Sequence, residues 1–248
     1  MPRIKTISQL VVASAIIAFM VSANSCNYAS SKNHSATQPV IVIDPGHGGT
    51  SNAGRSDANH AIGPNGTLEK ALTLSLSVKV AEILGQQGYK VVLTRSDDSN
   101  LGLPQRAKMG SDNNAEVFLS IHFNGDANNT IQGVETWVHP ASGSDSKLFA
   151  TALVRDIVAA SGNKNRGVKS NDWGVLDAGI QSPVTAACLL EVSFLTDPNE
   201  ENRLIMEDYK NKLAAAIANT IINYINHSTG ANPIQPIPAT TPANGGDG

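Results

Sequence analysis

The sequence predicts an α/β fold in which helices cover a largely parallel sheet. Five apolar runs of strand length alternate with longer segments of helical character along the chain. This alternation is typical of parallel strands joined by crossover helices. No stretch of the sequence repeats another, so a solenoid or repeat array is not expected.

The expected strands are short runs rich in valine, leucine and isoleucine. They cover residues 40–43, 89–93, 117–121, 133–138 and 186–190. A turn rich in glycine follows the first run. Pro45 fixes its own φ, and Gly46 permits a positive φ. Gly48 and Gly49 allow the backbone to approach a bound group closely. The run therefore predicts a strand that delivers His47 to an edge of the sheet.

The expected helices lie near residues 68–86, 103–113, 145–161 and 199–226. The last is the clearest, because apolar residues recur there at spacings of three and four. The first is contested, since residues 71–80 alternate apolar and polar as a strand would. A strand reaching Leu84 would exceed the common length, and Thr67 is a suitable N-cap. Gly85 and Gly88 are suitable stops, and we therefore predict a helix.

The first 25 residues predict export of the chain. Arg3 and Lys5 precede a long apolar run that fits the apolar part of a signal peptide with its flank. Three interpretations stay open: cleavage after Ala23, cleavage before Cys26 with lipid attachment, or an uncleaved anchor. Each places the domain outside the cytoplasm, in the periplasm or cell envelope. The membrane is expected to be contacted only through such a lipid or anchor.

Both ends of the chain differ in composition from the middle. Residues 1–25 are the signal peptide or lipoprotein signal, residues 26–38 form a polar linker, and residues 228–248 form a Pro- and Gly-rich tail that is expected to be disordered. Residues 39–227 remain for one globular domain. Cys188 lies in an apolar run and is expected to be buried and unpaired.

The charge of the chain disfavours nucleic acid as a partner. The formal charge is −3, and removal of the first 25 residues, with Arg3 and Lys5, takes it to −5. A surface of this sign repels the phosphate backbone, so no nucleic-acid partner is expected.

Three residues with metal-binding or acid–base chemistry follow predicted strands. His47, His122 and Glu191 each come at the end of an apolar run, and open parallel sheets bind ligands at the carboxyl ends of their strands. Glu69 opens the first predicted helix, which begins at the same edge. Two histidines and one glutamate can hold Zn²⁺ with one position open, while another glutamate stays free as a base. The spacings are long and form no compact metal-binding signature.

Seven motifs occur in order along the domain. They are Ile-Val-Ile-Asp-Pro-Gly-His-Gly-Gly (41–49), Leu-Glu-Lys (68–70), Gly-Tyr-Lys-Val-Val-Leu-Thr-Arg (88–95), Ser-Ile-His-Phe-Asn (120–124), Gly-Val-Glu-Thr (133–136), Asn-Arg-Gly-Val-Lys (165–169) and Leu-Leu-Glu-Val-Ser-Phe-Leu-Thr-Asp-Pro (189–198). Together they resemble the zinc-dependent N-acetylmuramoyl-L-alanine amidases of the type-3 amidase family, over essentially the whole domain.

The resemblance implies a fold, a site and a reaction. It implies a twisted, mostly parallel sheet of about six strands flanked by helices. Carried over residue by residue, the ligands of one zinc ion fall on His47, Glu69 and His122, and the catalytic glutamate falls on Glu191. The implied reaction is hydrolysis of the amide between N-acetylmuramic acid and L-alanine of peptidoglycan, in cell-wall remodelling or turnover. The protein is expected to act as a monomer on glycan strands that carry stem peptides.

The chain departs from the family pattern at three positions. Relatives often have Gly at Ser193 and Arg at Asp177, and a Pro usual near Thr185 is missing. None of these is one of the four chemical residues, but Asp177 is expected to alter substrate contacts or product release. Two other functions stay open: a catalytically silent peptidoglycan-binding module, and a zinc peptidase or deacetylase acting on another cell-envelope amide.

Other polar residues receive weaker expectations. Glu135 is expected to be structural, and Asn124 to close a turn, with substrate binding as its alternative. Roles at stem-peptide carboxylates and in solvent or at helix dipoles stay open for Arg95, Arg106 and Arg166. The candidates to orient the ligating histidines are Asp44, Ser120 and Glu116. The histidines expected to be non-catalytic are His34, His60, His139 and His227.

Overall fold

The computed structural model describes residues 38–230 of the chain. The predicted signal segment, almost all of the predicted linker and the predicted tail from residue 231 onward lie outside the described residues. The last helix continues to Thr229, two residues beyond the domain end predicted at residue 227.

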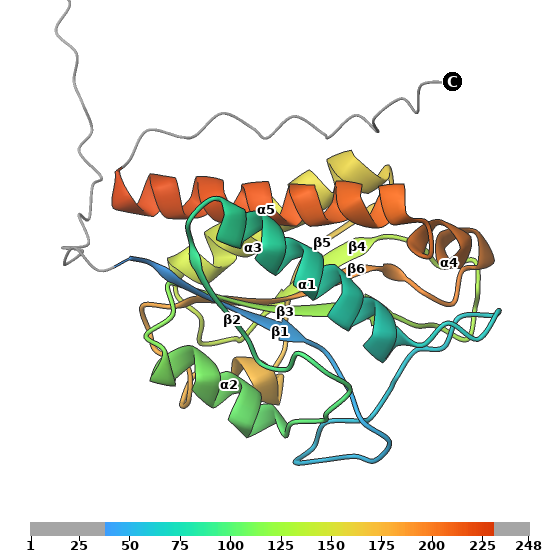
Figure 1. Ribbon diagram of the computed structural model, residues 1–248, viewed down its shortest axis with the longest axis horizontal. Coiled ribbons are helices and arrows are strands. Elements are labelled where there is room, and N and C mark those ends of the chain that lie inside the picture. Colours follow the sequence, from blue (N-terminus) through green and yellow to red (C-terminus); the bar gives the residue numbers. More distant parts are fainter. Residues whose placement is uncertain (1–37, 231–248) are drawn as a thin grey trace, which may run out of the picture. The chain divides into compact units, whose positions relative to one another are not determined.

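The described residues form six strands and five α-helices (Figure 1). The strands are β1 (Val40–Pro45), β2 (Lys90–Leu93), β3 (Val117–Asn124), β4 (Val134–Val138), β5 (Asn165–Ser170) and β6 (Ala186–Phe194). The helices are α1 (Glu69–Gln86), α2 (Leu103–Asp112), α3 (Ser144–Ser161), α4 (Pro198–Leu204) and α5 (Glu207–Thr229), with a short 3₁₀ helix η1 (Gly174–Leu176). Strands and helices alternate along the chain, except that β4 follows β3 and α5 follows α4 directly. The predicted fold class is confirmed.

The six strands form one sheet in the order β2-β1-β3-β6-β4-β5. All neighbouring pairs are parallel except β4 and β6, which are antiparallel. The carboxyl ends of β1, β3 and β6 therefore lie at one edge, and the start of β4 lies there too. The sequence analysis did not predict β5, because its polar sequence lacks an apolar run, as is usual for an edge strand exposed to solvent.

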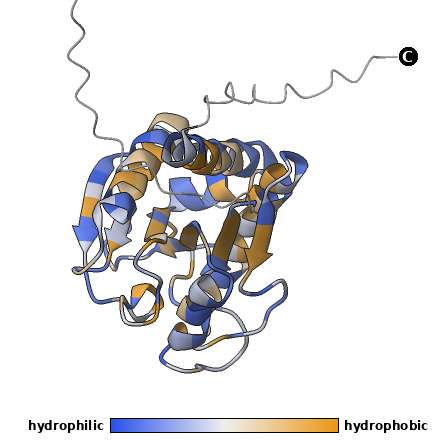
Figure 2. Ribbon diagram, turned by 90° about the vertical axis from the view of Figure 1, so that its left-hand side faces the viewer, coloured by the Kyte–Doolittle hydropathy of each residue, from blue (hydrophilic) through white to orange (hydrophobic). Residues whose placement is uncertain are grey.

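Side chains of the sheet alternate between two apolar layers. Ile41 and Ile43 of β1 pack in the cluster formed with α1, α3 and α5. Val42 and Phe118 face the opposite layer, where α2 and η1 lie. Figure 1 shows α1, α3 and α5 together above the sheet and α2 below it, and Figure 2 shows hydrophobic residues concentrated in the strands between them. The layer of α2 and η1 is the thinner one and leaves room for a cavity.

The contested segment is helical, as predicted. Residues buried along α1 recur every four positions, at Leu72, Leu76, Val80 and Leu84, which places them on one helical face. The predicted N-cap is wrong: Leu68 is the N-cap residue and makes no side-chain cap. The amide of Lys70 in the first turn is bound instead by the side chain of Asn59, at 2.9 Å. A residue from the preceding loop thus replaces the local cap.

Cys188 is fully buried and free of a disulfide, as expected. Its run in β6 lies at the centre of the sheet between β3 and β4. Within residues 38–230, none of the helices combines the length and the apolar character needed to cross a membrane.

Candidate metal centre

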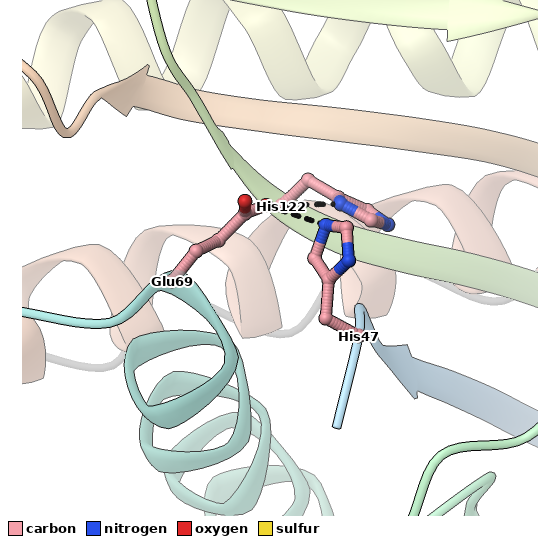
Figure 3. Close-up of side chains that lie close together, drawn as sticks. All are labelled: His47, Glu69 and His122. Carbon is pink, nitrogen blue, oxygen red and sulfur yellow. Dashed lines mark hydrogen bonds and ion pairs between the residues drawn. The ribbon is translucent and has the colours of Figure 1, made fainter. Parts of the chain in front are cut away.

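The structure brings three of the predicted site residues together at the carboxyl edge of the sheet (Figure 3). His47 follows β1, His122 lies near the end of β3, and Glu69 is the first residue of α1. One ligand atom from each lies within 4.8 Å of the others. Because β1 and β3 are parallel neighbours, their ends deliver both histidines to the same place.

A single carboxylate oxygen of Glu69 faces both imidazole rings. Glu69 Oε1 lies 3.2 Å from His47 Nε2 and 3.1 Å from His122 Nδ1. The two rings are nearly perpendicular, with centroids 4.8 Å apart. Two imidazole nitrogens and one carboxylate oxygen form the ligand set of several catalytic zinc sites. These residues could therefore hold a metal ion, and their chemistry fits zinc.

The backbone around His47 fixes which of its nitrogens faces the centre. His47 Nδ1 lies 2.9 Å from the carbonyl oxygen of Asp57, so Nδ1 carries the proton and Nε2 offers its lone pair. The residue itself has a positive φ of 61°, which non-glycine residues seldom adopt. Asp57 was not among the residues predicted to orient the histidines, because a backbone carbonyl leaves no signal in the side-chain sequence.

Two buried arginines hold the turn that carries His47. Arg106 donates to the carbonyl oxygens of Pro45 and His47, both at 2.7 Å. Arg95 donates to those of Pro45 and Gly46, at 3.0 and 2.8 Å. Both arginines are buried. They bind the backbone carbonyl oxygens of this turn, a role that was not among those predicted for them.

Asp44, at the end of β1, forms a buried ion pair with Arg106. Its carboxylate accepts hydrogen bonds from Arg106, Thr94 and Ser120, at 2.9, 2.5 and 2.6 Å. Burial raises the pKa of Asp44, but Arg106 and the two hydroxyl donors outweigh burial and lower it below 3.8. Asp44 and Ser120 therefore bind each other rather than a histidine. Glu116 accepts from Ser228 at a distant point of the fold.

Gly46 provides the space in which the ring of His122 lies. A Cβ added to Gly46 would lie 2.3 Å from His122 Cε1 and 2.5 Å from its Nε2. The carbonyl oxygen of Gly46 accepts a hydrogen bond from Thr73 of α1, at 2.7 Å. The ring of one candidate ligand thus packs directly on the turn that presents the other.

Backbone amides hold the carboxylate of Glu69. Glu69 Oε2 accepts from the amide of Ala61 at 2.8 Å, and Oε1 accepts from that of Phe123 at 3.1 Å. Burial raises the pKa of Glu69, but the hydrogen bonds and charges of His122 and His47 outweigh it and lower the pKa far below 4.5. The side chain is therefore ionised, as a metal ligand must be.

Glu201 of α4 fixes the loop that leads to Glu69. Its buried carboxylate accepts from the amides of Asn65 and Thr67, at 2.8 and 3.1 Å. A Cβ on Gly63 would lie 2.3 Å from Glu201 Cδ, so a larger residue there would displace this carboxylate. No sequence pattern marks Glu201, because a glutamate on a helix is usually exposed to solvent.

Glu191 is placed next to the three candidate ligands but is held differently. It is the register partner of His122 on β3 and of Glu135 on β4. Its Oε2 is buried and has no hydrogen-bond partner among the described residues. Burial raises the pKa of Glu191 well above 4.5, and the charges of Glu69 and Glu135 raise it further. Such a carboxylate readily accepts a proton.

Glu135 reaches the same edge because β4 runs antiparallel. Its carboxylate forms ion pairs with Arg166 and Lys169, at 2.7 and 2.5 Å, and accepts from Asn124 at 3.0 Å. Asn124 is the last residue of β3, lines the cavity and accepts from the amide of Gly125 at 2.8 Å, so both of its expected roles stay predictions. Arg166 is thus ion-paired with a carboxylate that it shares with Lys169, and its role at a substrate carboxylate stays a prediction.

A cavity of about 350 Å³ opens over the candidate metal centre. Its polar side contains the three candidate ligands and Glu191, while its apolar side contains Leu103, Trp137, Trp173, Val175 and Leu189. The two tryptophan rings meet edge to face, with centroids 5.8 Å apart. The cavity can therefore hold a substrate with one polar and one apolar side. No tryptophan was predicted to line the site, because the pairing occurs only once β4 and η1 come together.

The remaining histidines differ in position. His60 lines the cavity and stacks on His47 with centroids 6.3 Å apart, while His139 pairs with Asp172 at 3.1 Å, and neither belongs to the three candidate ligands. His227 lies in the last turn of α5, and His34 lies outside the described residues.

The three departures from the family pattern lie outside the candidate ligands. Thr185 is buried and donates to the carbonyl oxygen of Ala115, at 2.7 Å. Asp177 accepts from the amide of Gly179 in the turn after η1, at 2.8 Å. Ser193 is buried, and its hydroxyl has no partner among the described residues. The structure gives none of these residues a contact with the candidate ligands.

Comparison with known proteins gives one family. The sequence model of the N-acetylmuramoyl-L-alanine amidase family (Amidase_3) matches residues 41–223. The protein YqiI of Bacillus subtilis (strain 168) is 33% identical over 194 residues, which cover 76% of this chain and 88% of YqiI. The N-acetylmuramoyl-L-alanine amidase LytC of the same organism is 30% identical over 83% of this chain, but this match spans only 40% of LytC.

Solved structures agree with the sequence comparison. The catalytic domain of CwlV, an N-acetylmuramoyl-L-alanine amidase from Bacillus (Paenibacillus) polymyxa var. colistinus, superposes with a TM-score of 0.67 and 35% identity. The match covers 76% of this chain and 99% of that domain. The fold described here is therefore that of an amidase catalytic domain.

We expect Gly46→Ala to weaken zinc binding by about 10- to 100-fold, the usual effect of displacing a group that orients a ligand. The new methyl group overlaps the ring of His122. Competition with a chromophoric zinc chelator measures the affinity. Gly85→Ala in α1 is the matched control, because an added Cβ there meets no atom within 4 Å. Unchanged affinity in Gly46→Ala would contradict the packing argument.

We expect Glu201→Gln to weaken zinc binding by about tenfold. The substitution removes one of the two hydrogen bonds that the Glu201 carboxylate accepts from the loop before Glu69. Glu200→Gln is the control, because Glu200 is equally buried on α4 but binds Asn163 and Tyr209 instead of this loop. Zinc affinity and Tm are measured for both variants. The control should lose stability without losing affinity, and equal losses of affinity would refute the role given to Glu201.

We expect zinc affinity to fall as the pH falls through the pKa of His47. Burial lowers this pKa, but the hydrogen bond and charge of Glu69 outweigh burial and raise it above 6.5. Protons therefore compete with the metal below that value, by about tenfold in affinity per pH unit for one proton. Titrations between about pH 6 and 8.5 test this expectation. His139→Gln should leave the profile unchanged, and a flat profile would be incompatible with His47 as a ligand.

Proposed function

The chain belongs to the N-acetylmuramoyl-L-alanine amidase family, and on this premise we propose that it hydrolyses the amide between N-acetylmuramic acid and L-alanine of peptidoglycan with zinc as its cofactor. The single observation that carries the zinc proposal is the grouping of His47, Glu69 and His122, whose ligand atoms lie within 4.8 Å of one another. We propose these three residues as the ligands of one zinc ion.

A zinc ion at this place supplies Lewis acidity and lowers the pKa of the attacking water. The chain supplies the rest. Glu191 takes a proton from the water through its unpartnered Oε2 and later delivers this proton to the nitrogen of the leaving alanine. Its raised pKa favours the first of these transfers. The fixed tautomer of His47 keeps Nε2 directed toward the centre throughout.

The cavity orients the substrate around this centre. Its tryptophan wall offers an apolar surface on one side of the candidate ligands. Peptidoglycan lies outside the cytoplasmic membrane, and the apolar segment after Lys5 supports export to the periplasm or cell envelope. A mass measurement of the mature N-terminus would show whether Cys26 carries a lipid. We propose a monomer, because all candidate site residues come from one chain.

A catalytically silent peptidoglycan-binding module is a weaker alternative. Binding alone does not require a carboxylate with a buried, unpartnered oxygen beside a complete ligand set, and burying such an oxygen costs free energy. The presence of Glu191 therefore favours hydrolysis.

We expect Glu191→Gln to lower turnover by at least about 100-fold, as loss of a general base does, while zinc stays bound. His122→Ala should instead lose much of the zinc. The assay incubates the purified, zinc-loaded chain with muropeptides and identifies products by mass spectrometry. Wild-type protein should release stem peptides with an L-alanine amino terminus.

Glu82→Gln, on the exposed side of α1, is the control variant and should retain the wild-type rate. Wild-type rates in Glu191→Gln would refute the proposed base. Cleavage only within the stem peptide would replace the amidase assignment by a peptidase, and binding without cleavage would favour the silent module.

A further inference from the structure

Arg55 lines the cavity as a cation without an acidic partner among the described residues. Its side chain is exposed at the mouth of the cavity, on the apolar side. The other cations near the cavity are ion-paired: Arg106 pairs with Asp44, and Arg166 and Lys169 share the single carboxylate of Glu135. Among the described residues, Arg55 is therefore the cation of the cavity lining that forms no ion pair.

The backbone presents Arg55 at the tip of a tight hairpin. Ala53 and Ser56 exchange two backbone hydrogen bonds, and Gly54 and Arg55 between them both have positive φ, at 46° and 66°. This is the geometry of a two-residue turn of type I′, in which arginine is an unfavourable choice. A bulky residue held in such a conformation points to a role beyond closure of the turn.

Contacts with α2 hold the hairpin in place. The amide of Leu103 donates to the carbonyl oxygen of Gly54 at 2.9 Å. A Cβ on Gly54 would lie 2.7 Å from Gly102 Cα, so the two backbones touch. Ser56 also donates to Asn100, at 2.9 Å. The position of Arg55 is thus fixed by contacts between its hairpin and the start of α2.

The guanidinium lies against η1 on the tryptophan side of the cavity. A Cβ on Gly174 would lie 3.0 Å from Arg55 Nη2 and 3.4 Å from Leu103 Cβ. Glycine at 174, next to Trp173, therefore leaves space for the guanidinium. Asp57, two residues along the chain, accepts from Asn52 at 2.9 Å and forms no ion pair with Arg55. The charge of Arg55 stays directed to the cavity mouth.

We infer that Arg55 is a specificity-determining residue that binds a free carboxylate of the stem peptide, on the residue that follows alanine. This inference rests on the proposed function. A guanidinium binds a carboxylate with two parallel hydrogen bonds, which no carboxamide matches in charge. Arg55 thus selects stem peptides whose second residue is acidic over those in which that acid is amidated.

The test compares hydrolysis of two matched substrates by the zinc-loaded protein. The substrates are muramyl tripeptides whose second residue carries either a free α-carboxylate or an α-carboxamide. Wild-type protein should prefer the carboxylate. Arg55→Asn removes the charge while tolerating positive φ, and it should raise KM for the carboxylate substrate by up to about fivefold with little change in kcat. The carboxamide substrate should be unaffected, and Arg55→Lys should restore part of the preference.

Tm and zinc content of each variant check that the fold and metal centre are intact. Arg155→Gln, whose side chain pairs with Asp156 on the exposed side of α3, is the control and should behave as wild type. If Arg55→Asn lost activity equally on both substrates, or lost none, the inference about Arg55 would be overturned while the proposed function would stand. If wild-type protein cleaves neither substrate, the proposed function is overturned together with the inference.

Discussion

The site depends on the hydrogen bonds that hold the turn after β1. Three consecutive carbonyl oxygens, those of Pro45, Gly46 and His47, are bound by the buried side chains of Arg95 and Arg106. These bonds satisfy backbone acceptors that a turn would otherwise leave exposed to solvent or unpaired. They also hold His47 in a conformation that its residue type disfavours. Removing one partner of a buried pair such as Arg106–Asp44 costs about 3–5 kcal/mol, so the turn is firmly held.

The same edge of the sheet places two carboxylates in opposite electrostatic states. Glu69 receives two backbone amides and faces two imidazoles, so its charge is stabilised despite burial. Glu191 is only partly buried as a residue, but its Oε2 is buried and has no donor among the described residues. The difference separates the chemistry of a metal ligand from that of a base. Polar bonds thus hold the ligand in place, whereas the base keeps a free lone pair for a proton.

The antiparallel strand β4 gives the cavity its second wall. Its reversed direction brings Glu135 beside Glu191, and Glu135 in turn gathers Arg166 and Lys169. Trp137, two residues further on, contacts the ring of Trp173 on the apolar side of the cavity. The two candidate histidine ligands come from the ends of parallel strands, whereas part of the cavity wall beside them comes from the antiparallel strand. The candidate ligands and this wall are therefore positioned by different parts of the sheet.

The sequence by itself determined the α/β class, five of the six strands, the α1 helix and the four residues at the carboxyl edge. Short-range patterns suffice for these, because apolar runs end where parallel strands end and so mark one edge. Tertiary structure alone decided the capping of α1 by Asn59, the tautomer of His47, the loop anchor at Glu201 and the position of Arg55. Each depends on a contact with a backbone group or with a residue distant in sequence, which leaves no periodic trace in the chain.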